Sequence, residues 1–347
     1  MAEIALRAQP ETGRAATRVP TGVVVIVLAV LTVLLCLVSL AVGSQSLTLE
    51  ELVSAFVPGE RTVASIIVWQ LRMPRTVLAA MVGAALAMAG VVMQGLTRNP
   101  LAEPGILGVN AGASLSVVLS MSLLGLTDVG EFLWFAFAGA ALAAFLVHLI
   151  SVRSADAGPA RLVLAGVALG ASLRSITGTV TMYDSVTFDS YRFWVLGSLV
   201  DRDAELLVWV APFLVVGLVL ALASGLTLNA LALGEEQAKA LGVSPRRARA
   251  LALTSITLLC GASTAAVGPI SFVGLVVPHV LRLALGADQR KLLAVSVVAG
   301  PVLLLAADIL GRVILDSGEM EAGVVTAFIG GPVLLLMVIQ CMGVRGR

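Results

Sequence analysis

Asp308 and Arg312 are the ionisable residues best placed for chemistry, because both lie in a long apolar run. A spacing of four residues puts them on one face of a helix, where they can form an ion pair. Ionisable groups within a membrane are costly and usually functional, so proton or sodium transport is one hypothesis. A structural pair explains Asp308 equally well. Asp308 is also the only carboxylate well inside such a run, whereas a proton or sodium relay would need several.

Other patterns of catalysis or metal binding are missing from the sequence. The two lysines, Lys239 and Lys291, are followed by alanine and leucine, so the chain has no phosphate-binding GK[ST] loop. His148 and His279, the two histidines, have no carboxylate at ligand spacing, which favours packed or interfacial roles. The three cysteines form no CxxC pair. We therefore expect no catalytic residue, no metal site and no cofactor in this chain.

The composition is that of a membrane protein. Of 347 residues, 59% are hydrophobic and 12% are charged, whereas soluble domains carry about 25% charged residues. A globule of this length could not bury so much apolar surface, so the excess must face lipid. The net charge of +1, without basic stretches interleaved with aromatic residues, argues against a nucleic-acid partner.

Apolar windows of about 20 residues predict where the chain crosses the membrane. A shorter run, 271–285, follows Gly268-Pro269 and contains Pro278, so it could cross or re-enter. Most of the 22 basic residues lie inside if there are ten crossings and a cytoplasmic N-terminus. We therefore predict an all-α integral membrane protein with about ten transmembrane helices and both termini cytoplasmic. The other candidate spans are 22–43, 76–96, 105–124, 131–150, 161–181, 205–225, 250–268, 292–314 and 321–342.

The expected organisation is a single transmembrane domain, 22–342, between cytoplasmic tails 1–21 and 343–347. The first span exceeds the roughly 7–15 apolar residues of a signal peptide, which favours a retained helix. Five crossings in each half would make the halves inverted relative to each other. Both halves are broken by proline, at 99–105 and at 268–278. These breaks are a weak sign of a repeat, since proline and glycine can simply mark loop ends.

One cytoplasmic segment, 228–245, looks ordered and is too polar to cross. Gly234 and Gly242 bracket a short helix with acidic residues at its start, which suits the helix dipole. Ala238 and Leu241 lie on one side of this helix. A short helix beneath a membrane bundle suggests a docking element for another protein.

Several blocks in order along the chain resemble one family, the permease subunits of binding-protein-dependent ABC importers for ferric siderophores, heme and cobalamin. The resemblance covers about residues 25 to 342. The blocks are Leu-Arg-Met-Pro-Arg at 71–75, Arg-Asn-Pro-Leu-Ala-Glu-Pro at 98–104, Phe-Trp-Val-Leu-Gly-Ser-Leu at 193–199, Leu-Gly-Val at 241–243 and Gly-Pro-Ile-Ser-Phe-Val-Gly-Leu at 268–275.

The resemblance implies a multi-pass permease of the bacterial cytoplasmic (inner) membrane. Its partners would be a second permease subunit, identical or paralogous, two ATPase subunits that bind ATP and Mg, and an extracytoplasmic substrate-binding protein. Acidic residues of the binding protein would meet Arg72, Arg75 and Arg312 at the outer mouth, although these arginines could instead anchor helices at the interface. The ATPase would couple through Gly234, Glu235, Ala238, Leu241 and Gly242.

For the translocation path, the resemblance points to the span ending at Gln94 and the helix after Pro104. Packing roles for these residues stay open. The blocks at 97–102 and 108–114 are most similar to ferric-siderophore permeases, with heme or cobalamin as the alternative cargo. An ion-gradient-driven transporter would need more intramembrane carboxylates than Asp308 supplies. A structural scaffold would have no reason for the broken hairpins or the ordered cytoplasmic helix. The predicted path residues are Met93, Gln94, Asn99, Pro100, Asn110 and Ser114.

Overall fold

The computed structural model describes residues 20–43, 47–57, 62–152, 159–315 and 318–345, and every regular element in these ranges is helical. Eight helices are long and apolar enough to cross a membrane, and two shorter apolar helices accompany them. These ten correspond to the ten predicted spans. They are α1 (Thr21–Ala41), α4 (Met73–Thr97), α5 (Val109–Leu124), α6 (Val129–Val152), α7 (Pro159–Tyr183), α9 (Ala204–Ala232), α11 (Pro245–Val267), α12 (Val273–Leu285), α13 (Gln289–Val313) and α14 (Ala322–Arg345).

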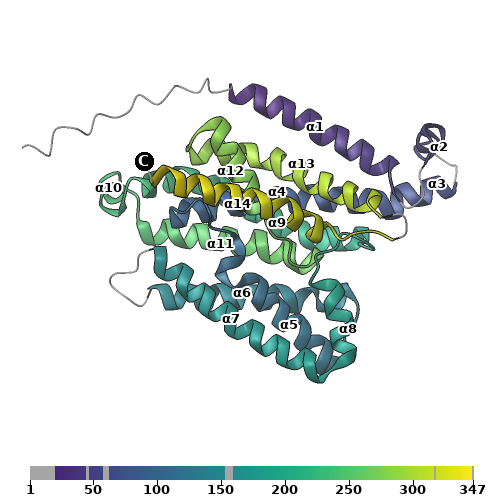
Figure 1. Cartoon of the computed structure of the whole chain (residues 1–347), viewed down its shortest axis with the longest axis horizontal. Coiled ribbons are helices and arrows are strands. Elements are labelled where there is room, and N and C mark those ends of the chain that lie inside the picture. The colour runs from purple at the N-terminus through teal and green to yellow at the C-terminus, as the bar shows by residue number, and fades with distance from the viewer. Residues whose placement is uncertain (1–19, 44–46, 58–61, 153–158, 316–317, 346–347) are drawn as a thin grey trace, which may run out of the picture.

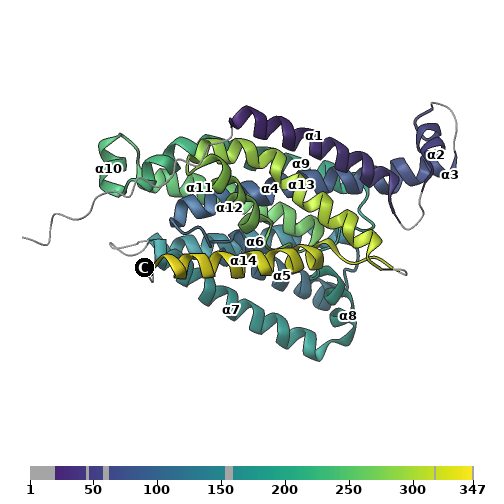
Figure 2. The same cartoon turned by 45° about the horizontal axis from the view of Figure 1, so that its top comes forward.

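Six short elements connect the long helices: α2 (Leu49–Ser54), α3 (Val63–Ile66), the π-helical turn η1 (Ile67–Arg72), the 3₁₀ turn η2 (Pro104–Leu107), α8 (Ser185–Trp194) and α10 (Glu235–Ala240). In Figures 1 and 2, α10 lies at one end of the bundle, and α2, α3 and α8 lie at the other. We call these the α10 end and the α8 end. Helix α1 begins, and α14 finishes, towards the α10 end (Figure 1). Both described termini therefore share one end, as an even number of crossings requires.

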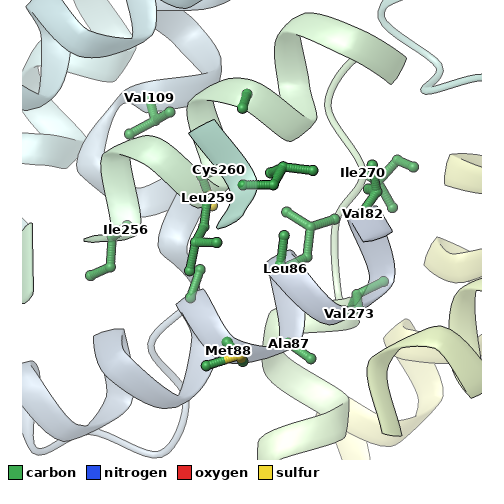
Figure 3. Packing of buried hydrophobic residues seen from close by; sticks show 14 of the residues in the cluster. Val82, Leu86, Ala87, Met88, Val109, Ile256, Leu259, Cys260, Ile270 and Val273 are labelled. Carbon is green, nitrogen blue, oxygen red and sulfur yellow. The ribbon is translucent and has the colours of Figure 1, made fainter. Parts of the chain in front are cut away.

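Helix α4 is the centre of the bundle, whereas α1 and α7 lie at its periphery (Figures 1 and 2). In the apolar window that contains α4, 83% of the residues are buried, against 11% for α1 and 17% for α7. Figure 3 shows apolar side chains of α4, including Leu86 and Met88, beside Ile256 and Leu259 of α11. The peripheral helices expose their side chains, as expected for a protein surrounded by lipid.

Glycine pairs allow the closest helix contacts. A Cβ on Gly90 of α4 would lie 1.9 Å from the carbonyl oxygen of Gly274 in α12. A Cβ on Gly300 of α13 would lie 2.0 Å from the carbonyl oxygen of Gly83. Since no side chain fits at such distances, α4 meets α12 and α13 backbone to backbone, which is typical of membrane helices with small interfacial residues.

The boundaries differ from the prediction at two functional segments. The helical path into α4 begins at Val63, thirteen residues before the predicted span, because α3 and η1 run into it. Helix α9 continues to Ala232, so the first residues of the 228–245 segment are helix and not loop. Tail residues 1–19 and 346–347 lie outside the described residues.

Candidate functional site

Three arginines and two carboxylates form a cluster where α1, η1, α4 and α13 meet at the α8 end. The cluster comprises Arg72, Arg75, Asp308, Arg312 and Glu319. The π-helical turn ends at Arg72, and Pro74 follows it at the start of α4. Arg72, Arg75 and Arg312 are only 6%, 9% and 5% exposed. The three residues predicted to dock a binding protein are therefore together, but largely inside the protein.

Arg72 and Arg312 cap the C-terminus of α1. Nη1 of Arg72 donates to the carbonyl oxygens of Leu40 and Ala41, each at 2.8 Å. Nη1 of Arg312 donates to those of Ser39 and Val42, at 2.8 and 3.0 Å. The last carbonyls of a helix have no partner within it and carry partial negative charge. Two guanidinium groups therefore satisfy the end of α1 and tie it to η1 and α13.

Asp308 lies between two of the arginines. Nε and Nη2 of Arg75 donate to Oδ1 of Asp308 at 3.0 and 2.7 Å. Nη2 of Arg312 pairs with the other oxygen, Oδ2, as the spacing of four predicted. The Asp308 residue is 1% exposed. A buried charge needs partners of this kind, so the geometry gives Asp308 a structural role and leaves it without access to water.

Arg75 has a second acidic partner, Glu319, on the connection between α13 and α14. Nη1 of Arg75 lies 2.6 Å from Oε2 of Glu319. The side chains of Arg75 and Glu319 are 11% and 20% exposed, so this pair is the more accessible part of the cluster. Met320, next in the chain, is fixed by a backbone hydrogen bond to the Gly311 carbonyl, at 2.9 Å.

A hollow of about 550 Å³ opens beside the cluster. Its wall carries charges of both signs, since Asp201, Arg202 and Asp203 of the α8–α9 connection face the cluster across it. Burial lowers the pKa of the Arg202 guanidinium, and Glu321, Asp201 and Asp203 oppose this effect. The full lining is Gly43, Ile67, Gln70, Leu71, Arg72, Arg75, Val200, Asp201, Arg202, Asp203, Arg312 and Glu319.

The two proline-bearing breaks contact each other deep in the bundle. The Glu103 carboxylate, just before η2, accepts a hydrogen bond from the backbone N–H of Phe272 at 2.7 Å. Phe272 has φ 69° and precedes α12. Gln94 Nε2 donates to the Gly274 carbonyl oxygen at 3.4 Å. Irregular backbone is tolerated within a membrane only where its polar groups find partners, and here the first break and α4 supply partners to the backbone of the second.

The predicted path residues lie around these breaks, inside the protomer. Met93, Gln94 and Ser114 are 0%, 2% and 5% exposed. Asn110 accepts a hydrogen bond from Thr264 Oγ1 at 3.0 Å. Pro100 and the neighbouring Asn99 are exposed at the end of α4. Within one protomer, Met93, Gln94 and Ser114 are buried between helices and Asn110 is half-buried.

The 228–245 segment holds the predicted short helix as α10, from Glu235 to Ala240. Gly234 and Gly242 bracket it with φ 118° and 79°, conformations that glycine adopts easily. Ala238 is fully buried against Ala230, Leu231 and Ala248, and Glu235 pairs with Arg249 of α11. Leu233 and Leu241 are 64% and 63% exposed. The segment thus projects from the bundle, and its exposed Leu233 and Leu241 form what we call its apolar tip.

Sequence reasoning missed Glu319 and the capping of α1. Asp308 was paired only with Arg312, because a spacing of four is visible in sequence. The contacts from Arg75 to Asp308 and Glu319 join residues 233 and 244 positions apart, and Arg312 reaches Ser39 over 273 positions. No local spacing signals such contacts. The arginines' position next to apolar spans was the one available sign.

The chain matches the model of the FecCD transport family over residues 31–340. It belongs to this family. The ferric enterobactin transport system permease protein FepD of Escherichia coli (strain K12) is 44% identical over 313 residues, covering 90% of this chain and 93% of FepD. The vitamin B12 import system permease protein BtuC of Vibrio cholerae is 42% identical over 278 residues, covering 79% and 83%.

The fold is similar to that of a solved metal-chelate type ABC transporter in an inward-facing conformation. The TM-score is 0.81 at 28% identity, covering 92% of this chain and 99% of the other. This FecCD-family chain is therefore a multi-pass inner-membrane permease of an iron-chelate, heme or vitamin B12 ABC importer. It is a transport subunit and not an enzyme, and ATP is bound by separate ATPase subunits of the complex. Membership also implies ATPase and binding-protein partners.

Proposed function

We propose that this permease imports a ferric siderophore. The observation that carries the proposal is the 44% identity to FepD, which extends over nine tenths of both chains. The blocks at 97–102 and 108–114 support the same branch of the family. BtuC of Vibrio cholerae is nearly as similar, so vitamin B12 and heme are the competing cargoes.

Uptake into reconstituted vesicles separates these cargoes. The permease would be co-reconstituted with its ATPase and supplied with its cognate binding protein, meaning the one that supports ATP-driven uptake with this permease. Ferric enterobactin, hemin and vitamin B12 would then be offered in turn. We expect the ferric siderophore to enter fastest. Uptake of hemin or vitamin B12 alone would assign the chain to another branch.

We further propose that two permease subunits form the transmembrane unit and that each binds one ATPase subunit through the 228–245 segment. The exposed surface of α7 supports a second permease. Its Ser172, Ser175 and Thr179 are exposed, although lipid offers hydroxyl groups no partner beyond the helix itself. A second protomer or a water-filled path would cover them. Whether the second subunit is identical or paralogous stays open.

The apolar tip of the 228–245 segment supports ATPase docking. Leu233 and Leu241 project from a segment whose own core, around Ala238, is closed. Because α10 is joined to α11 by the Glu235–Arg249 pair, a push on α10 would be passed to α11. Gly234 and Gly242 set the two turns of this projection. The segment is suited to transmit motion from an ATPase to the membrane helices.

At the α8 end, we propose that the binding protein docks over the hollow beside Arg72, Arg75 and Arg312. These arginines line the hollow although each is mostly buried. Arg72 and Arg312 would act mainly by holding α1 in place. The path through Met93, Gln94, Asn99, Pro100, Asn110 and Ser114 stays a prediction. Of these residues, Met93, Gln94 and Ser114 are buried in one protomer, so the helices would have to move for them to contact the cargo.

A further inference from the structure

The three arginines of the cluster differ in how easily their partners could be exchanged. Arg72 and Arg312 donate to backbone carbonyls of α1, and Arg312 also pairs with the buried Asp308. Replacing these acceptors would require the end of α1 to unravel. Only a partner that is itself a mobile side chain could be replaced without unfolding a helix end.

Arg75 has such a partner. Its Nε and Nη2 are held by Asp308, whereas its Nη1 is held by Glu319. The Glu319 side chain is 20% exposed, against 1% for Asp308. Because Met320 is anchored to Gly311 through the backbone, rotation of the Glu319 side chain alone would release Nη1 while the connection stays in place.

The hollow gives another acidic side chain room to approach Nη1. Both Arg75 and Glu319 line it, and its volume of about 550 Å³ exceeds that of a carboxylate side chain. A guanidinium fork binds carboxylates through parallel N–H groups. Arg75 would keep Asp308 on one edge of its fork and accept a new carboxylate on the other.

We propose that Nη1 of Arg75 is a carboxylate-binding position, filled by Glu319 in the free permease and taken over by an acidic side chain of the docking binding protein. This inference rests on the proposed docking at the α8 end. It assigns Glu319 the role of an internal competitor.

The test is the affinity of the cognate binding protein for the purified permease–ATPase complex in lipid nanodiscs. Glu319→Gln removes the competing charge, and we expect it to tighten binding by about fivefold, the scale of a partly exposed ion pair. Glu319→Asp keeps the charge but draws the carboxylate back from Arg75. We expect it to tighten binding by a smaller factor.

Asp201→Asn is the matched control for charge, because Asp201 lines the same hollow and its φ of 52° is one that asparagine tolerates. Its effect measures what the loss of one negative charge does to binding in general. A gain for Glu319→Gln above that of Asp201→Asn, together with a gain for Glu319→Asp, supports the exchange. Equal or weaker binding of both Glu319 variants overturns it. If the unaltered complex binds no binding protein, the proposed docking fails, and this inference with it.

Discussion

Arg72 and Arg312, on different elements, donate hydrogen bonds to four successive backbone carbonyls at the end of α1. This relationship gives the arginines a structural task that is independent of any partner. It also explains why positive charge is retained at the α8 end, against the bias of basic residues towards the cytoplasm. The proposed docking at this end would therefore act on residues that already hold the bundle together.

Arg72→Gln should destabilise the permease. The substitution removes charge-assisted hydrogen bonds to the carbonyls of Leu40 and Ala41, which we expect to cost about 2–3 kcal/mol. Thermal unfolding in detergent would show this as a lower midpoint. Arg192→Gln is the control, since Arg192 pairs with Asp189 on the exposed surface of α8. An unchanged midpoint for Arg72→Gln would contradict the capping role.

Asp308→Asn should lower the stability of the permease more than the loss of an exposed ion pair such as Arg192–Asp189 does. It leaves Arg75 and Arg312 buried with an unbalanced charge, and breaking a buried pair costs about 3–5 kcal/mol. Adding Arg75→Gln to Asp308→Asn should recover part of the stability, because the excess of arginines over carboxylates in the cluster is then smaller, although Glu319 loses its partner. The yield of monodisperse protein and its unfolding midpoint provide the measurement. A double variant no more stable than Asp308→Asn would speak against this pairing.

Gly90→Ala should disrupt the contact between α4 and α12. The new Cβ would lie 1.9 Å from the Gly274 carbonyl oxygen, and neither backbone can move without separating the helices. We expect a lower unfolding midpoint and slower transport. Gly22→Ala, in the peripheral helix α1, is the control because a Cβ there has no neighbour within 4 Å. Equal behaviour of the two variants would be inconsistent with the close approach.

Leu241→Asp should uncouple the permease from its ATPase while leaving it folded. Leu241 is exposed at the tip of the 228–245 segment, so a charge there is tolerated by the free permease but not by an apolar interface. Ala238→Pro should also uncouple, through loss of the hydrogen bond from Ala238 N–H to the Gly234 carbonyl. Co-purification of the ATPase is the measurement, with Glu236→Gln of α10 as control. Normal recovery of ATPase with Leu241→Asp would exclude this tip as the docking point.

Acid should weaken the junction between α9 and α13. Hydrogen bonds, first from the Asn229 side chain and then from the backbone N–H of Arg290, hold the pKa of Asp288 below its ordinary value of 3.8. The stability that ionised Asp288 contributes is therefore fully present above this ordinary value. It is lost as the pH falls through the lower pKa that Asp288 has in the folded protein. We expect the midpoint temperature of unfolding to decrease once the pH is lowered below about 4, and to decrease less in Asp288→Asn. The same acid dependence in both proteins would remove Asp288 as its source.

The sequence predicted the helices well where a local signal existed. Among the described residues, composition and window length predicted the eight helices that are long enough to cross a membrane and the two shorter apolar ones. Gly234 and Gly242 marked the ends of α10. The extension of α4 through η1 was missed because the π-helical turn is polar at Gln70 and Arg72. The internal partners of the arginines were missed because they join the ends of helices distant in sequence. Packing of the whole bundle decides such contacts, and no spacing reveals them.

The central claim is that this chain moves a metal chelate as part of an ATP-driven importer. The most direct measurement is uptake of a ferric siderophore into vesicles that contain the permease and its ATPase, with the binding protein outside and ATP enclosed. We predict that uptake requires all of these components and continues when an ionophore removes the proton gradient. Uptake that persists without ATP and stops when the proton gradient collapses would contradict the account and indicate a secondary transporter.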